Sequence, residues 1–398
     1  MSLDLAQVAE QIEKMAARLK AEQAERKQKI SLAIETLHKQ AGQLDHLRQK
    51  IQSSRTTWLV AEIPDRLDIH EAPPPCPQDF IVLASDGSHI DVDRHRSARC
   101  FLINVGTIKL RYGKHPDAEL SSSPSLYFQA EDLVISSPSG NSYEPIEGAL
   151  LGVKRSVEEC HSLADAASEL EDSLPTLALL DGSLVLWTLA GKKTYPEYVS
   201  QALVDEGFLR YLEEMRKLSL VGQLAIAAYI SFPRSTEVTN ALRLAICPHN
   251  PVDCDRYCRG KDAERQCDSV AGVLDRAIFN QLLSAGERSA TFGSRSSIVE
   301  QRYGMHRANF FYIKIDDEEI ARVEIPLWVA QSGELTGLVH ALIWQQCRQG
   351  QGYPVALSEA HEKAVVTGAD REQFWQLVER DVALKSSAKS RSKRNRWI

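Results

Sequence analysis

The sequence predicts an α/β fold, and three observations support this prediction. Apolar runs rich in Ile, Val, Leu and Ala end at Asp-Gly, as buried strands do, at residues 79 to 85 and 177 to 180. A long helical pattern, residues 146 to 170, separates these two runs. A strand that follows a long helix is typical of a βαβ crossing, which puts the strands in one sheet flanked by helices.

The N-terminal segment has a different pattern. Residues 2 to 52 place apolar side chains at steps of three and four, with Glu, Lys, Gln and Arg between them. This spacing predicts one or two long amphipathic helices. A Pro-rich joint at residues 72 to 77 then leads into the first strand. We therefore expect a coiled-coil-like helical arm over residues 1 to 71.

The remaining elements continue the mixed pattern to residue 384. Strands are expected at residues 98 to 112, 125 to 135, 224 to 231, 308 to 315 and 321 to 328, and helices at 198 to 218, 335 to 348, 358 to 366 and 371 to 384. We expect one domain over residues 72 to 384, followed by a basic, disordered tail over residues 385 to 398.

Composition and charge restrict the classes of function. The chain has 398 residues, no apolar stretch of the roughly 18 residues that span a bilayer, and no secretory signal pattern. We expect a soluble, cytoplasmic protein. Outside residues 1 to 55 and the basic tail, 31 Lys and Arg face 47 Asp and Glu. Nucleic acid would therefore need a local basic groove, the tail or a partner.

The tripeptide Asp-Gly-Ser occurs twice, beginning at Asp86 and at Asp181, each time after an apolar run. A turn explains either copy alone, because Asp caps its own backbone and Gly accepts a positive φ. After Asp181, however, the chain stays apolar to Leu189, which favours a buried continuation over an exposed hairpin. Two carboxylates at strand ends, with a third from the helix between them, would suit one or two Mg²⁺ or Mn²⁺ ions.

Five short segments carry a family resemblance. In order they are Asp86-Gly-Ser, Leu-Leu-Asp181-Gly-Ser-Leu, Tyr-Ile-Ser-Phe-Pro-Arg234-Ser, Ile-Pro-Leu-Trp328-Val-Ala and Tyr353-Pro…Ala-His361. Over residues 79 to 380 the chain resembles the NurA family of DNA repair nucleases.

The resemblance implies a fold and an activity. The fold is an RNase H-like mixed sheet, and the activity is Mn²⁺-dependent, or Mg²⁺-dependent, hydrolysis of phosphodiester bonds. Family members are 5′ to 3′ exonucleases that also cut single strands. They form homodimers and resect DNA ends together with the hexameric ATPase HerA.

The resemblance also implies site residues. The two family aspartates fall on Asp86 and Asp181, and its late tyrosine and histidine fall on Tyr353 and His361. The tyrosine would position a phosphate or stack on a base, and the histidine would bind metal or move a proton. Without the resemblance, Tyr353 is better explained as a core aromatic and His361 as a solvated helix residue.

The family glutamate is assigned to Glu158, because Lys154 and Arg155 precede it as basic residues do in the family. Glu159 is the alternative, since it lies only about 100° further round the helix. Asp86, Glu158 and Asp181 would then hold the metal.

Four of the eight cysteines form a second cluster, in one short polar segment. They are Cys247, Cys254, Cys258 and Cys267. Four thiols match the ligand count of a tetrahedral Zn²⁺ or a 4Fe-4S cluster, although the spacing is that of no common finger or ferredoxin. The alternative is a loop with incidental free thiols.

Basic residues offer contacts to nucleic acid. Arg234, Arg295, Arg302 and Arg307 could meet phosphates, since Arg donors suit backbone contacts. They equally fit a solvated surface. The leading hypothesis is a metal-dependent DNA nuclease; a non-catalytic adaptor on the same fold and an RNase on the same core are the alternatives.

Overall fold

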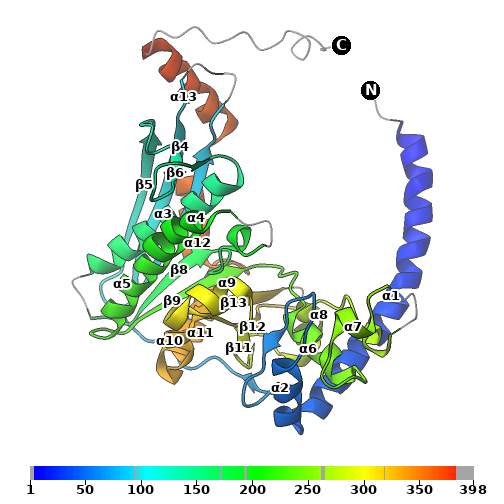
Figure 1. The fold of residues 1–398 in the computed structure, drawn as a ribbon. Coiled ribbons are helices and arrows are strands. Elements are labelled where there is room, and N and C mark those ends of the chain that lie inside the picture. Colours follow the sequence, from blue (N-terminus) through cyan, green and yellow to red (C-terminus); the bar gives the residue numbers. More distant parts are fainter. Residues whose placement is uncertain are drawn as a thin grey trace. The chain divides into compact units, whose positions relative to one another are not determined.

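The computed structural model describes residues 4–93, 96, 98–170, 173–191, 195–260, 265–317 and 319–381. The predicted basic tail lies outside the described residues. The chain divides into two compact units. Unit 1 comprises residues 1–72, 231–296 and 309–323, and unit 2 comprises residues 73–230, 297–308 and 324–398. Figure 1 gives the element labels.

Unit 2 contains five neighbouring strands of a mixed sheet, in the order β9-β8-β3-β4-β5. Strand β3 pairs in parallel with β8, and β8 in parallel with β9. On its other edge β3 pairs antiparallel with β4, which pairs antiparallel with β5. Their bounds are β3 (Phe80–Ile90), β4 (Phe101–Tyr112), β5 (Asp117–Tyr127), β8 (Thr176–Asp181) and β9 (Leu224–Ile230).

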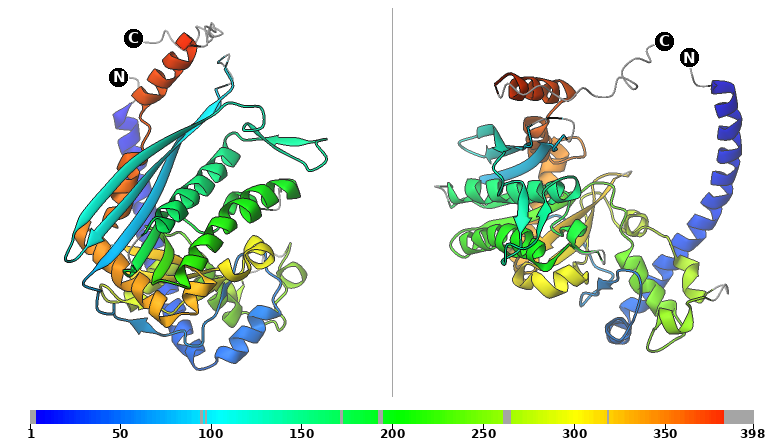
Figure 2. Two further views of the ribbon diagram at one scale, coloured as in Figure 1. Left: turned by 90° about the vertical axis from the view of Figure 1, so that its left-hand side faces the viewer. Right: turned by 45° about the horizontal axis from the view of Figure 1, so that its top comes forward.

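Helices cover both faces of these strands. Helix α3 (Ala149–Ser168) packs on β3 from one face, beside α5 (Leu209–Ser219), and α12 (Val355–Ala364) packs on β3 and β4 from the other (Figure 2). Glycines permit both approaches. A Cβ on Gly87 would lie 2.6 Å from Glu159 of α3, and one on Gly106 would lie 2.3 Å from the carbonyl oxygen of Ala360 in α12.

The other elements of unit 2 are shorter or peripheral. They are the strands β6 (Val134–Ser136) and β7 (Tyr143–Pro145) and the helices η1 (Trp187–Leu189), α4 (Glu197–Ser200), η2 (Gln201–Phe208), α9 (Ser297–Arg302), η4 (Gly304–His306), α10 (Leu327–Ala330), α11 (Gly333–Gln349) and α13 (Gly368–Asp381). Among them η2 is a π-helix that runs directly into α5.

Unit 1 joins the N-terminal helices to later parts of the chain. Its helical elements are α1 (Leu5–Ala41), α2 (Leu44–Gln52), α6 (Glu237–Ile246), α7 (Cys254–Tyr257), η3 (Gln266–Val270) and α8 (Asp275–Leu282). Its strands are β1 (Ala61–Glu62), β2 (His70–Glu71), β10 (Arg288–Ser289), β11 (Phe292–Ser294), β12 (Ala308–Lys314) and the first part of β13 (Ile320–Pro326).

Helix α1 has two parts with different surroundings. Near its C-terminal end Ile30, Ala33 and Leu37 are buried in the unit 1 core. Near its N-terminus Leu5 and Ile12 are more than half exposed. Apolar burial within unit 1 therefore holds α1 from Ile30 onward and not its earlier turns.

Most predicted elements are found within a few residues of their expected bounds, including the N-terminal helices. Two expectations were wrong. The single strand expected at residues 125 to 135 is absent, because β5 ends at Tyr127 and the short strand β6 begins only at Val134. The first Asp-Gly-Ser copy was placed at a strand end, yet β3 continues to Ile90, so Asp86 lies inside the strand. Pairing with β4 along the whole of β3 carries the strand through its polar residues.

None of the helices in the described part of the chain combines the length and apolar character needed for a membrane span.

Candidate functional site

The two aspartates lie on neighbouring strands at the same level. In the parallel pair of β3 and β8, Ser85 is opposite Leu180, so Asp86 and Asp181 come one position later on each strand. Side chains alternate along a strand, and neighbouring strands lie about 4.8 Å apart. Both carboxylates therefore lie on the same face of the sheet, side by side. Asp86 is paired with Gly106 of β4, which places this face under α12.

Two residues from the end of the domain contact these carboxylates. Nδ1 of His361, on α12, lies 2.8 Å from Oδ2 of Asp86. The hydroxyl of Tyr353, just before α12, donates a hydrogen bond to Oδ1 of Asp181 at 3.0 Å. His361 is exposed, with 62% of its side chain accessible, so its ring reaches solvent as well as the aspartate. The structure thus brings together four of the residues that the sequence singled out.

Glu158 and Glu159 point to different surroundings on α3. Glu158 is bonded to Lys154 and lies 3.5 Å from Nδ1 of His161. Glu159 is buried, approaches Gly87 of β3, and forms an ion pair with Arg155 at 2.9 Å. The geometry therefore favours Glu159, the alternative assignment, as the third carboxylate beside the aspartates.

Electrostatics also link Glu159 to the aspartates. Burial raises the pKa of Glu159 to about 8; Arg155 opposes this effect, and the charges of Asp86 and Asp181 add to it. Burial likewise raises the pKa of Asp181, assisted by Asp86 and opposed by the hydrogen bond from Tyr353. The three carboxyl groups therefore lie close enough to oppose one another's ionisation, and a bound cation would favour the charged form of each.

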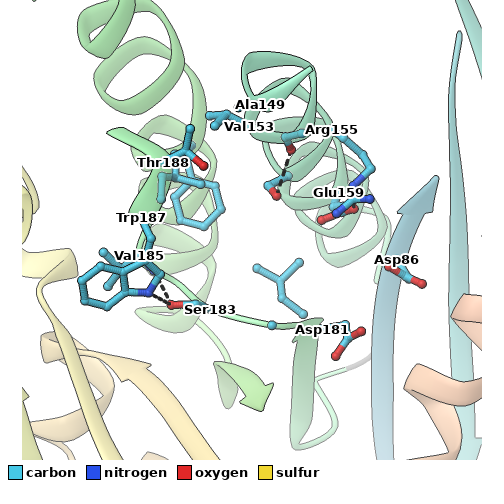
Figure 3. Close-up of a pocket in the computed structure, with 16 residues that line it drawn as sticks. Asp86, Ala149, Val153, Arg155, Glu159, Asp181, Ser183, Val185, Trp187 and Thr188 are labelled. Atoms are coloured by element: carbon cyan, nitrogen blue, oxygen red, sulfur yellow. Dashed lines mark hydrogen bonds and ion pairs between the residues drawn. The ribbon is translucent and has the colours of Figure 1, made fainter. Parts of the chain in front are cut away.

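A pocket of about 490 Å³ lies beside these carboxylates. Asp86, Glu159 and Asp181 line it together with Arg155 and Trp187 (Figure 3). Its remaining wall comes from α3, from the segment that follows Asp181 and from Phe208. A pocket of this volume is within the range that holds a small-molecule ligand.

The NurA domain model matches residues 80–366, which is more than half of the chain. The chain belongs to the NurA family. The matched range contains Asp86, Glu159 and Asp181, which line the pocket, and Tyr353 and His361, which contact the two aspartates.

Two solved NurA structures are similar to this chain, both at low identity. One, with manganese, is 13% identical, and the match covers 81% of this chain and 92% of the other, with a TM-score of 0.33. The second, bound to dAMP and manganese, is 12% identical and covers 91% and 98%, with a TM-score of 0.36. No curated protein matches the chain.

The donor types in the NurA pocket fit a hard divalent cation, since carboxylate oxygens are the ligands that Mn²⁺ and Mg²⁺ prefer. Their arrangement is not that of a completed metal cage. Within the described residues, no group of three or more His, Cys, Asp or Glu side chains is placed to hold a metal ion. Instead, each carboxylate has a protein partner: His361 for Asp86, Tyr353 for Asp181 and Arg155 for Glu159.

The four clustered cysteines lie in unit 1. Cys247 and Cys267 are buried in its core, and Cys254 and Cys258 are half-buried. Burial is the main reason that the pKa of Cys254 is raised to about 11, and the neighbouring thiols add to this effect. The described residues give no support to the predicted Zn²⁺ or 4Fe-4S cluster. Nε of Arg243, on α6, donates a hydrogen bond to the carbonyl oxygen of Cys267 and so links α6 to this segment.

The four predicted nucleic-acid contacts are divided between the units. In unit 1, Arg234 is exposed, and Nη1 of Arg295 donates to the carbonyl oxygen of Ile51 at 3.0 Å. In unit 2, Arg302 forms ion pairs with Glu197 and Asp205, and Arg307 is half-buried. Arg295 and Arg302 thus already have protein partners in this structure.

The sequence reasoning missed Trp187 and the role of Arg155 in the pocket. Trp187 falls in an apolar run that was expected to be buried throughout, yet it is 42% exposed while Val185 and Leu186 are buried. Arg155 was noted as a basic residue before the glutamate, and its i,i+4 spacing to Glu159 would have indicated the ion pair.

Proposed function

We propose that this chain is a metal-dependent nuclease that hydrolyses phosphodiester bonds in DNA. The observation that supports the proposal most directly is the pocket lined by Asp86, Glu159 and Asp181, with His361 and Tyr353 hydrogen-bonded to the two aspartates. Membership of the NurA family supports the same assignment.

Asp86, Glu159 and Asp181 would hold Mn²⁺ or Mg²⁺, with His361 as a further ligand or as a proton carrier. A bound divalent cation would neutralise charge on a phosphate and lower the pKa of a bound water. Glu158, the first assignment, is less favoured, because Lys154 and His161 engage its carboxylate.

His361 is placed to move a proton. Hydrogen bonding between Nδ1 and the Asp86 carboxylate favours the tautomer with the proton on Nδ1, which leaves Nε2 as the basic nitrogen. That nitrogen can accept a proton from an attacking water, or, once protonated, return it to the leaving oxygen. Tyr353 orients the Asp181 carboxylate through its hydroxyl.

Several finer assignments belong to the same proposal. An RNase H-like core is supported by the antiparallel β3-β4-β5 set followed by the parallel β8 and β9. The exposed apolar positions at the start of α1 suit a coiled-coil-like arm in a homodimer. The family resemblance alone supports the remaining assignments. These are exonuclease polarity, single-strand cutting, a HerA-type ATPase partner, a role in end resection and a cytoplasmic location. The division into an arm, a nuclease domain and a basic tail remains a prediction.

The test is cleavage of labelled oligonucleotides by the purified chain. Single-stranded DNA, double-stranded DNA and RNA of one sequence are incubated with a Mn²⁺ series, and products are resolved on denaturing gels. We expect Mn²⁺-dependent cleavage of DNA. Asp86→Ala and Asp181→Ala should each reduce the rate by about 10²-fold or more, as loss of a preorganised charged group does.

Asp165→Asn is the matched control, because Asp165 lies on the same helix as Glu159 but outside the pocket lining. It should cleave at the wild-type rate. Full activity of either alanine variant would reject the site. A folded wild-type protein that binds DNA but cleaves no substrate at any Mn²⁺ concentration would favour the adaptor alternative, and preference for RNA would favour the RNase.

A further inference from the structure

Trp187 occupies an unusual place for a tryptophan in an apolar run. It begins η1, six residues after Asp181, and lines the same pocket as the three carboxylates (Figure 3). Its neighbours Val185 and Leu186 are 2% and 5% exposed, while Trp187 itself is 42% exposed. Single exposed apolar residues are common on proteins and alone need no explanation. The contacts of the indole distinguish this one.

The indole is held at its edge. Nε1 of Trp187 donates to Oγ of Ser183 at 3.0 Å, and Oγ of Ser183 donates to Oε2 of Glu324 at 2.7 Å. Glu324 is buried, with 1% exposure, and also accepts the N–H of Leu184 at 2.9 Å. Two hydrogen bonds in series thus connect the ring to a buried carboxylate. The polar edge of the indole is satisfied inside the protein, while part of its apolar ring remains accessible.

The pocket therefore combines two chemistries. In Figure 3, Asp86, Glu159 and Arg155 lie on one side and Trp187 on the other, with Asp181 and Ser183 between them at the end of β8. The volume, about 490 Å³, suits a single nucleotide better than a duplex end. A ligand that fills it would place an anionic group that binds cations, such as a phosphate, near the carboxylates. Its flat apolar group would lie at the indole. A nucleotide has both parts.

We propose that Trp187 stacks on an unpaired base of the substrate strand and so positions the adjoining phosphate at the carboxylates. Every base has a π-face, so this contact selects single-stranded nucleic acid without selecting sequence. The inference rests on the proposed nuclease function for the position of the phosphate. The stacking contact itself concerns binding and can be measured without cleavage.

Binding is measured first, in the Asp181→Asn background, so that cleavage does not interfere. Fluorescence anisotropy of a labelled single strand is titrated against Asp181→Asn alone and against the same protein carrying Trp187→Ala or Trp187→Phe. We expect Trp187→Ala to weaken binding by about 10-fold, within the range for removing one stacking aromatic, and Trp187→Phe to retain most of the affinity. Phe128→Ala, which removes an aromatic that is 62% exposed outside the pocket, should bind as the parent does.

An abasic series distinguishes stacking from a structural effect. One base at a time is removed from the strand near the 5′ end. At the position whose base stacks on Trp187, loss of the base should weaken binding to the parent protein by about 10-fold. The Trp187→Ala protein should bind this abasic strand as well as it binds the intact strand. In the cleaving enzyme, Trp187→Ala should raise KM and change kcat less, because the lost contact is formed in the ground state as well.

The outcomes separate the two proposals. Unchanged binding by Trp187→Ala, or equal loss on intact and abasic strands at every position, would overturn the stacking contact and leave the nuclease proposal standing. Binding that depends on Trp187 in a protein that cleaves nothing would retain the stacking contact and overturn the nuclease. Circular dichroism of each variant establishes that it is folded.

Discussion

The two Asp-Gly-Ser copies have the same sequence and different structures. The first lies within β3, which continues four residues beyond Asp86 to Ile90, while the second ends β8 at Asp181. Their glycines differ accordingly. Gly87 has an ordinary extended conformation, and a Cβ there would meet Glu159 at 2.6 Å. Gly182 has a φ of 92°, and a Cβ there would meet open space.

This difference shows that one tripeptide supports the site in two ways. At Gly87 the missing side chain makes room for a buried carboxylate from another element. At Gly182 glycine permits a backbone conformation that other residues rarely adopt, and so turns the chain away after the aspartate. The serines differ too: Ser88 donates to the carbonyl oxygen of Ala364, and Ser183 donates to Glu324.

The largest effect expected from this comparison concerns the carboxylate beside Gly87. Glu159→Gln keeps the size of the side chain but cannot ionise to bind a cation, so metal-dependent cleavage should fall by about 10²-fold. Glu158→Gln, one residue earlier on the same helix, should change the rate by less than about threefold, because that carboxylate is engaged with Lys154. Initial rates at saturating Mn²⁺ measure both. If Glu158→Gln lost more activity than Glu159→Gln, Glu158 would be the third carboxylate of the site.

An intermediate effect is expected from Gly87→Ala. The added methyl group must displace Glu159 or Arg155, and a shift of about 1 Å in a catalytic group can cost 10²-fold. We expect at least a 10-fold loss of activity, with the free energy of unfolding lowered by about 1–3 kcal/mol. Activity and urea denaturation are measured on the same samples.

The double variant Gly87→Ala with Glu159→Gln tests the route of this effect. If the methyl group acts through Glu159, the double variant should be about as active as Glu159→Gln alone. Additive losses would show that Gly87 affects the site by another path.

The smallest effect on activity is expected from Gly182→Ala. Alanine at a φ of 92° is strained, so the free energy of unfolding should fall by about 1–2 kcal/mol while the rate at saturating substrate changes less than in Gly87→Ala. Gly333→Ala, at the start of α11 and without a positive φ, is the control and should stay within about 0.5 kcal/mol of wild type. Equal destabilisation by both would contradict the backbone explanation.

Local sequence patterns were sufficient to predict many of the strands and helices of this fold. The apolar runs before Asp86 and Asp181 predicted β3 and β8, and the helical pattern between them predicted α3. Side-by-side placement of the two aspartates follows from parallel pairing of those strands, which the intervening helix implied.

What local pattern could not supply depends on residues far apart in the chain. The Asp-Gly pair at residues 86 and 87 suggested a strand end, and only pairing with β4 carries β3 past it. Glu158 and Glu159 are adjacent, so periodicity cannot choose between them; the choice follows from the space above Gly87. Likewise, the exposure of Trp187 depends on its bond to Ser183 and on Glu324, about 140 residues later in sequence.

Cleavage of the chain just before α12, the helix that packs on Gly106, would remove part of the site. Because α12 supplies His361, and the turn before it supplies Tyr353, both partners of the aspartates come from the last part of the NurA domain. A chain cut between α11 and α12, by a protease or by early termination, would retain Asp86, Glu159 and Asp181 and lose His361, the partner of Asp86. The fragment would also lose the buried apolar face of α12, including Leu357 and Ala360, that packs on β3 and β4, so it should be less stable than the intact protein.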